Sequence, residues 1–234
     1  MDEELEAIRS KYEISPVEEH LDDLKLQRIS LSDKLTIYLM KSGIGKVNAG
    51  YSTALACSYY HPNYVFNVGV AGGFSESQNI LDMVFATHFI YMDVDITSFG
   101  IPPGQILGEP SPYYYTDPTL LSIIQKFDQE GKLGAKAFYG LIGSSDKFIT
   151  NNEEDIKRIR TVFPDVIAVE MEGAAIAHVC SRQKVPLLSL RSLSDVPVHP
   201  VNNTQSFQEM LEISAKRAAD ICYMFIEQLK VQNQ

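Results

Sequence analysis

The sequence predicts an α/β fold in which helices cover both faces of a central sheet. Apolar, β-branched runs typical of buried strands alternate along the chain with segments of helical periodicity, and glycine-bearing turns close two of those runs. The 234 residues are enough to bury one large core, so we expect a single domain over residues 1–234.

The first elements follow from changes in periodicity. Residues 2–11 predict an amphipathic helix with acids in its first turn, where the helix dipole favours them. Residues 24–31 alternate between apolar and polar, and 35–40 follow after a short polar turn, so two joined strands are expected. The turn at 42–46 then leads into a helix of small residues, 47–57, which can pack closely on a sheet.

The rest of the chain predicts five buried strands and four helices. The strands are expected at 64–71, 83–92, 137–143, 166–171 and 186–191. The helices are expected at 119–130, 153–162, 173–183 and 206–230. The glycine- and proline-rich stretch 99–112 is the one long irregular segment, and such loops in compact domains are usually functional.

Composition excludes several classes of function. Thirty acids against twenty bases give a net charge of -10, which opposes nucleic-acid binding. The apolar stretches are too short to span a bilayer, and we expect no charged-then-apolar leader. Cys57, Cys180 and Cys222 lie far apart without metal-ligand spacing and are expected to be buried, reduced thiols of a cytoplasmic protein. We expect no metal site.

Acidic residues end two of the predicted strands. Glu170 and Glu172 follow one strand, and Asp195 ends the next along the chain, so we expect them in register at neighbouring strand ends. Such carboxylates can bind the hydroxyls of a ribose; alternatively, the glutamates are helix N-terminal charges and Asp195 caps a turn. Asp195 is a candidate general acid. An inward Arg191 needs an acid, a water or an anion, and a structural ion pair satisfies it equally well.

Two glycine-bearing turns, 42–46 and 69–73, resemble phosphate-binding loops only loosely. Neither is a Walker loop, and neither has the dinucleotide-binding spacing. They indicate close backbone approach to a ligand or tight strand-to-helix turns. His178 falls on a predicted helix and is expected at its surface or in the core rather than on a metal.

Five motifs occur along almost the whole chain: SGIGKV from Ser42, NVGVAGG from Asn67, DVDxTxFG from Asp93, AVEMEGAAIAHV from Ala168 and RSLSD from Arg191. Together they resemble the 5′-methylthioadenosine/S-adenosylhomocysteine nucleosidases of the purine and uridine phosphorylase superfamily. The resemblance implies one α/β domain with a twisted, mixed central sheet, assembled as a homodimer. It also implies cofactor-free hydrolysis of the N-glycosidic bond between adenine and a 5′-thio-substituted ribose.

The resemblance also implies catalytic roles. Asp195 would protonate adenine N7 and so make the base a better leaving group. Glu172 would bind the ribose hydroxyls, and Met171 would pack under the sugar. Glu4 would activate the attacking water, which Arg191 would help to hold.

The same resemblance implies how the substrate is enclosed. Phe148 and Ile149 would contact adenine, and Ile44 and Phe207 would line an apolar pocket for the 5′-alkylthio group. Ile96 and Phe99 would reach this pocket from the partner subunit, which gives the long loop a function. The expected substrate-binding set is completed by Glu170, Ala71, Gly72 and Ser194.

The chain departs from the family pattern at two places. Val70 stands where the family usually has serine or threonine, which removes one polar contact worth about 1 kcal/mol. The first family strand, an apolar run before the acidic segment that contains Glu4, is absent, and we expect that the recorded start is late.

Two further functions stay open at this point, and so does the choice of substrate. A phosphorylase would need a phosphate pocket with two or more arginines, and Arg191 is the only arginine near the motifs. A weakened adenine-nucleoside binding protein would explain Val70 and the missing strand. Among hydrolases, the sequence is compatible with methylthioadenosine, adenosylhomocysteine, 5′-deoxyadenosine or aminofutalosine as substrate.

Overall fold

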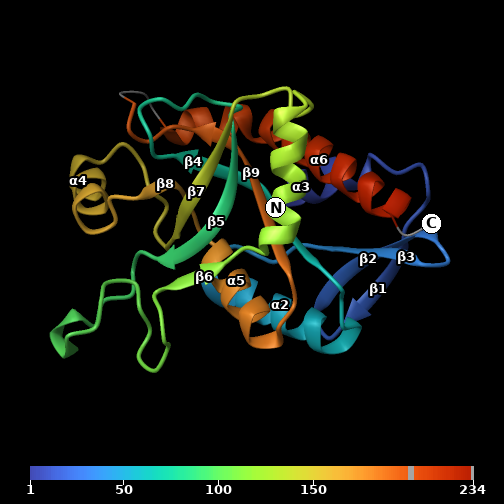
Figure 1. The fold of residues 1–234 in the computed structure, drawn as a ribbon, viewed down its shortest axis with the longest axis horizontal. Helices are drawn as coiled ribbons and strands as arrows, with labels where there is room; N and C mark the ends of the chain where they lie inside the picture. Colours follow the sequence, from blue (N-terminus) through green and yellow to red (C-terminus); the bar gives the residue numbers. More distant parts are fainter. Residues whose placement is uncertain (200–202, 233–234) are drawn as a thin grey trace.

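The strands of the described residues form two separate sheets (Figure 1). The computed structural model describes residues 1–199 and 203–232. A three-stranded antiparallel sheet consists of β1 (Val17–Leu21), β2 (Leu24–Ser32) and β3 (Leu35–Met40). The second sheet has the order β6-β5-β7-β8-β4-β9, with strands β4 (Val65–Gly73), β5 (Met83–Tyr91), β6 (Tyr113–Tyr115), β7 (Ala137–Ser144), β8 (Val166–Glu170) and β9 (Leu187–Asp195). Among the described residues, no strand pairing links the three-stranded sheet to the larger sheet.

The larger sheet closes on itself because β5 also pairs with β9. Three of its pairs are parallel (β4–β9, β5–β7 and β7–β8), and three are antiparallel (β4–β8, β5–β9 and β5–β6). The sheet is therefore mixed, as expected. Strand β4 pairs with β9 along its length and with β8 only at Gly72 and Gly73, so these glycines join two strand ends.

Helices pack on opposite faces of the closed sheet, as the α/β pattern predicts (Figure 1). On one face, α2 (Lys46–Tyr60) lies against α5 (Gly173–Gln183), whose buried alanines form a core with Val84, Phe89 and Ile142. On the other face, α3 (Pro118–Gln129) and α6 (Asn203–Gln232) bury Ile124 and Phe225 against Phe85. The remaining helices are α1 (Asp2–Arg9), which packs on α6, and α4 (Glu153–Val162), which covers a smaller core around Met92 and Phe163.

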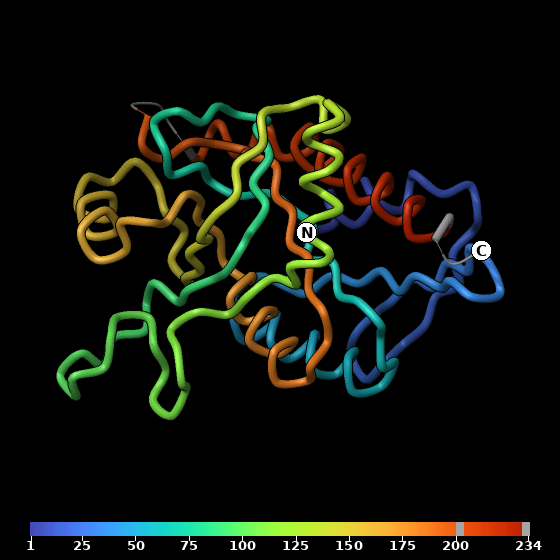
Figure 2. The backbone as a smooth tube through the Cα atoms, in the orientation of Figure 1, coloured from blue at the N-terminus to red at the C-terminus, as the bar shows by residue number. Residues whose placement is uncertain are grey.

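The long irregular segment projects from the body of the molecule. It runs from the end of β5 to β6 and forms the green extension at the lower left of Figure 2. A single 3₁₀ turn, η1 (Thr97–Phe99), interrupts it, and Phe99 is 79% exposed. An apolar side chain this exposed contributes nothing to the core of its own chain.

Most of the predicted helices and strands are present, but two strands were not predicted, one strand is longer than predicted, and the expected position of the acids is wrong. Strands β1 and β6 were not predicted, and β9 extends four residues beyond Arg191, to Asp195. The acids do not end neighbouring strands: β4 lies between β8 and β9, because it pairs antiparallel with one and parallel with the other. Within the described residues, no helix is long and apolar enough to cross a membrane.

Candidate functional site

A cavity of about 250 Å³ opens where β4, β8 and β9 meet. Every candidate site residue from the sequence lines it except Ile96 and Phe99. The lining candidates are Glu4, Ile44, Ala71, Gly72, Phe148, Ile149, Glu170, Met171, Glu172, Arg191, Ser194, Asp195 and Phe207. Residues from the first helix to the last are therefore brought to one place.

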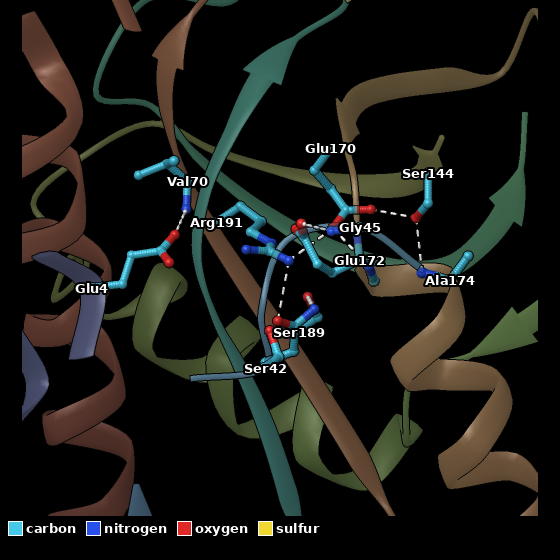
Figure 3. Close-up of polar contacts among 12 residues, drawn as sticks. Glu4, Ser42, Gly45, Val70, Ser144, Glu170, Glu172, Ala174, Ser189 and Arg191 are labelled. Atoms are coloured by element: carbon cyan, nitrogen blue, oxygen red, sulfur yellow. Dashed lines mark hydrogen bonds and ion pairs between the residues drawn. The ribbon is translucent and has the colours of Figure 1, made fainter. Parts of the chain in front are cut away.

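Glu170 and Arg191, which both line the cavity, form a buried ion pair (Figure 3). Arg191 Nη2 lies 2.8 Å from Glu170 Oε2, and the two side chains are 4% and 3% exposed. Arg191 Nη2 also donates to Asn67 Oδ1 at 3.1 Å. The structural ion pair considered for Arg191 is thus present, and it holds the guanidinium at a fixed place beside the cavity.

The Glu170 carboxylate is fully occupied by groups of the protein. Besides Arg191, it accepts the backbone N–H groups of Glu172 (3.0 Å) and Gly173 (2.6 Å) and the hydroxyl of Ser144. The hydroxyl of Ser144 accepts the Ala174 N–H at 2.8 Å, so both side chains anchor the start of α5. Glu170 is therefore an anchor for the helix N-terminus, the alternative considered from sequence, although it lines the cavity.

Glu172 is held differently. Its Oε1 accepts the Gly45 N–H at 2.9 Å, and its Oε2 makes no hydrogen bond to any residue that the structure describes (Figure 3). Burial and the negative charge of Glu170 raise the pKa of Glu172, whereas the charge of Arg191 and the Gly45 hydrogen bond lower it. One carboxylate oxygen is thus fixed, and the other is available to a ligand hydroxyl.

Asp195 is the last residue of β9 and is buried, with only 2% of the residue exposed. Its Oδ1 accepts the Ser194 hydroxyl at 3.0 Å. Its Oδ2 faces Gly72, where a Cβ would lie 3.3 Å from that oxygen. The missing side chain at position 72 therefore leaves the carboxylate room beside the cavity. The turn predicted at 69–73 is wrong, because these residues continue strand β4, where they pair with β8 and β9.

Glu4 reaches the cavity from α1. Its Oε1 accepts the Val70 N–H at 3.0 Å (Figure 3). The two atoms nearest to the position of a Cβ on Gly69 are Arg191 Nη1 and Glu4 Oε1, so the guanidinium and the carboxylate face each other over this glycine. The Val70 side chain is buried with Ala7 and other apolar residues of α1 and α6, and it offers no hydroxyl to the cavity.

Apolar side chains enclose the rest of the cavity. Phe148 and Phe207 meet edge to face, with ring centroids 5.4 Å apart, and Ile44 is 59% exposed at the rim. Met171 lies between the two glutamates in sequence and also lines the cavity. An apolar wall with a few carboxylates suits a ligand with an aromatic base and an apolar substituent.

Ile96 and Phe99 do not line the cavity of their own chain. They lie on the projecting segment between β5 and β6. Their expected contribution from a partner subunit stays a prediction.

Sequence reasoning missed Asn67, Ser144 and Gly45 as site residues. Asn67 is a polar residue inside an otherwise apolar strand, and its amide also donates to Ser189 Oγ at 3.3 Å. This interruption of the apolar pattern was the available signal. Ser144 and Gly45 end a strand and begin a helix, where polar and glycine residues are common, so the sequence alone did not distinguish them.

The described residues contain no group of three or more histidine, cysteine or acidic side chains placed to hold a metal ion. The three cysteines are buried and free, as expected. His178 lies on α5, where it stacks on Tyr114 with ring centroids 4.3 Å apart and is partly buried, in agreement with the core or surface position expected for it.

The chain belongs to the phosphorylase superfamily, whose family model matches residues 1–227. The chain is 39% identical over 194 residues to the 5′-methylthioadenosine/S-adenosylhomocysteine nucleosidase of Geobacillus sp. (strain WCH70), covering 83% of this chain and 82% of the relative. It is 35% identical to the protein of the same name from Bacillus subtilis (strain 168), covering 98% and 96%. Within the superfamily, the chain therefore belongs to the 5′-methylthioadenosine/S-adenosylhomocysteine nucleosidase family.

A solved structure agrees with this assignment. The Helicobacter pylori 5′-methylthioadenosine/S-adenosylhomocysteine nucleosidase superposes with a TM-score of 0.90 at 28% identity, covering 97% of this chain and 95% of that one. That enzyme was solved with a pyrrolidinol bearing an aminopyrrolopyrimidine and a propynylthio group.

Proposed function

We propose that this chain hydrolyses the N-glycosidic bond of 5′-methylthioadenosine and S-adenosylhomocysteine, releasing adenine and the 5′-thio-substituted ribose. The spacing of two carboxylates along β4 carries the proposal. Glu4 is held at Val70, and Asp195 faces Gly72. These positions are two residues apart, on the order of 7 Å along a strand. Inverting glycosidases separate their acid and base by about 6.5–9.5 Å to admit a water, so the spacing suits hydrolysis.

Each carboxylate has one role in this reaction. Asp195 donates a proton to N7 of the leaving adenine, which offsets the charge that develops on the base. Glu4, opposite Arg191, orients and deprotonates the water that attacks the sugar. Glu172 accepts hydrogen bonds from the ribose hydroxyls through its available oxygen, and Met171 packs under the ring. Proton transfer by a positioned side chain contributes about 10²–10⁴ in rate.

The apolar lining sets the substrate. Phe148 and Ile149 contact adenine, and Ile44 and Phe207 accept the alkylthio group. In a homodimer, Ile96 and Phe99 of a second copy complete this pocket, which explains an apolar side chain left exposed on a projecting loop. The name and the bound compound of the Helicobacter pylori enzyme support a ligand with a purine-like base and a thioether.

The cavity does not favour phosphorolysis. Arg191 is the one arginine among the described residues that line it, and one of its nitrogens is already engaged by Glu170 and Asn67. A phosphate dianion needs more positive charge than this site retains. Water is therefore the nucleophile that the cavity suits.

Incubation with each nucleoside, with and without phosphate, tests the proposal by the adenine released. We expect release from methylthioadenosine and adenosylhomocysteine at the same rate in both buffers. Asp195→Asn should slow release by about 10²–10⁴ while the protein remains folded. No adenine from either nucleoside, or unchanged release by Asp195→Asn, would refute the proposal or the role of Asp195, respectively.

A further inference from the structure

The first turn of α2 is fixed by carboxylates from other parts of the chain. Its N-cap residue is Gly45, which has no side chain to cap the helix. The Gly45 N–H donates to Glu172 at 2.9 Å, and the Lys46 N–H donates to Asp146 Oδ1 at 2.8 Å. Helix starts leave several N–H groups without partners, so these two carboxylates take the place of a local cap.

Asp146 is itself held in place by Asp93 and Lys46. The Asp146 N–H donates to Asp93 Oδ2 at 2.9 Å, and Lys46 Nζ lies 2.6 Å from Asp93 Oδ1 and 3.5 Å from Asp146 Oδ2. These contacts join the start of α2 to the segments that follow β5 and β7. We call Lys46, Asp93 and Asp146 the clamp.

The clamp joins segments that line the cavity. Ile44 lies just before the first turn of α2, and Phe148 lies two residues after Asp146. A Cβ on Gly45 would lie 3.1 Å from Asp146 Oδ1, and Gly45 has φ of 87°. A residue without a side chain thus permits both the positive φ and the close approach of the carboxylate.

We propose that Asp146 is a positioning residue for ribose binding: it holds the Lys46 N–H, and thereby sets the neighbouring Gly45 N–H against Glu172. The proposal rests on the ribose role of Glu172 in the proposed function. The side chains of Lys46, Asp93 and Asp146 are 20%, 31% and 53% exposed, so solvent screens their ion pairs. The clamp therefore acts through geometry, by fixing two consecutive N–H groups.

The test compares binding of two unreactive ligands by calorimetry. The first is the 7-deaza analogue of 5′-methylthioadenosine, which lacks the nitrogen that Asp195 protonates. The second is the same analogue without its 2′ and 3′ hydroxyls. Asp146→Ala should raise the Kd of the first by about tenfold, the loss of one charge-assisted hydrogen bond, and that of the second by less than about twofold. Asp146→Asn retains an acceptor for the Lys46 N–H and should restore most of the affinity.

Asp117→Ala is the matched control. Asp117 caps α3 through the Thr119 and Leu120 N–H groups, so its loss also uncaps a helix, but away from the cavity lining. It should leave the ratio of the two Kd values unchanged. A similar rise for both ligands in Asp146→Ala, or no rise, would overturn the proposal. If the unsubstituted protein binds both ligands equally, the ribose role of Glu172 is wrong and the inference falls with it.

Discussion

Arg191 Nη2 lies 2.8 Å from Glu170 Oε2 in an ion pair that is almost fully buried. The pair joins β8 to β9 across β4, and it places the guanidinium opposite Glu4 over Gly69. The geometry on one side of the cavity therefore depends on a structural contact that need not touch the ligand.

Glu170→Gln should destabilise the protein by about 3–5 kcal/mol, because it leaves the Arg191 charge buried without a counterion. Urea unfolding measures this loss. The matched control is Glu76→Gln, which removes an exposed ion pair with Arg160 (2.6 Å) and should cost at most about 1 kcal/mol. Equal effects of the two substitutions would show that the buried pair is not important for stability.

The activity should fall on the acid side of the pH profile through Glu172. Burial and the Glu170 charge raise its pKa, and only the ionised carboxylate accepts two ribose hydroxyls fully. As pH falls through this raised pKa, Glu172 gains a proton, and kcat/KM should decline at a higher pH than an ordinary glutamate would cause. Glu172→Gln should lower kcat/KM at neutral pH and remove this limb. An unchanged limb in the variant would assign it to another group.

Val70→Thr should increase hydrolysis at some cost in stability. The substitution keeps the shape of the side chain and adds a hydroxyl at the cavity wall, where it can hold water or ribose. One added hydrogen bond of about 1 kcal/mol corresponds to roughly a fivefold gain in kcat/KM. Because Val70 packs with Ala7 and Ile8, burying the hydroxyl should lower the free energy of unfolding by about 1–3 kcal/mol. A decrease in kcat/KM would mean that water is positioned without this wall.

Two impaired variants should complement each other if a second copy supplies Phe99. Phe99→Ala removes the loop contribution, and Asp195→Asn removes the acid. Mixed dimers would contain one cavity with both native Asp195 and a native loop. We expect a gain in adenine release on mixing the variants, measured after subunit exchange. No gain, with mixed dimers demonstrated by native mass spectrometry, would place the exposed Phe99 outside the site.

The sequence predicts the buried strands well because their apolar runs are long and closed by turns. Strand β6 was missed because its three residues, Tyr113–Tyr115, are too short a run to show apolar–polar alternation. Strand β1 was missed because its two consecutive glutamates interrupt that alternation. The order of strands depends on long-range pairing. It was therefore not evident that β4 separates the strands carrying Glu170 and Asp195.

Site residues could be predicted from the sequence where a motif contains them. Contacts made by backbone N–H groups could not be predicted in this way. Glu172 and Asp195 belong to strand-end motifs, and both line the cavity. Glu170 is in the same motif, but its carboxylate accepts hydrogen bonds from Ser144, Arg191 and the first residue of α5. The N–H groups of Gly45 and Val70 carry no side-chain signal, so their contacts with Glu172 and Glu4 become visible only in the folded chain.

Hydrolysis in ¹⁸O-labelled water tests the central claim most directly. The products of 5′-methylthioadenosine are analysed by mass spectrometry in phosphate-free buffer. The account predicts free adenine and a methylthioribose that carries one ¹⁸O at its anomeric carbon, with Glu4→Gln slowing both in parallel. Adenine that forms only when phosphate is added, or no adenine at all, would contradict it.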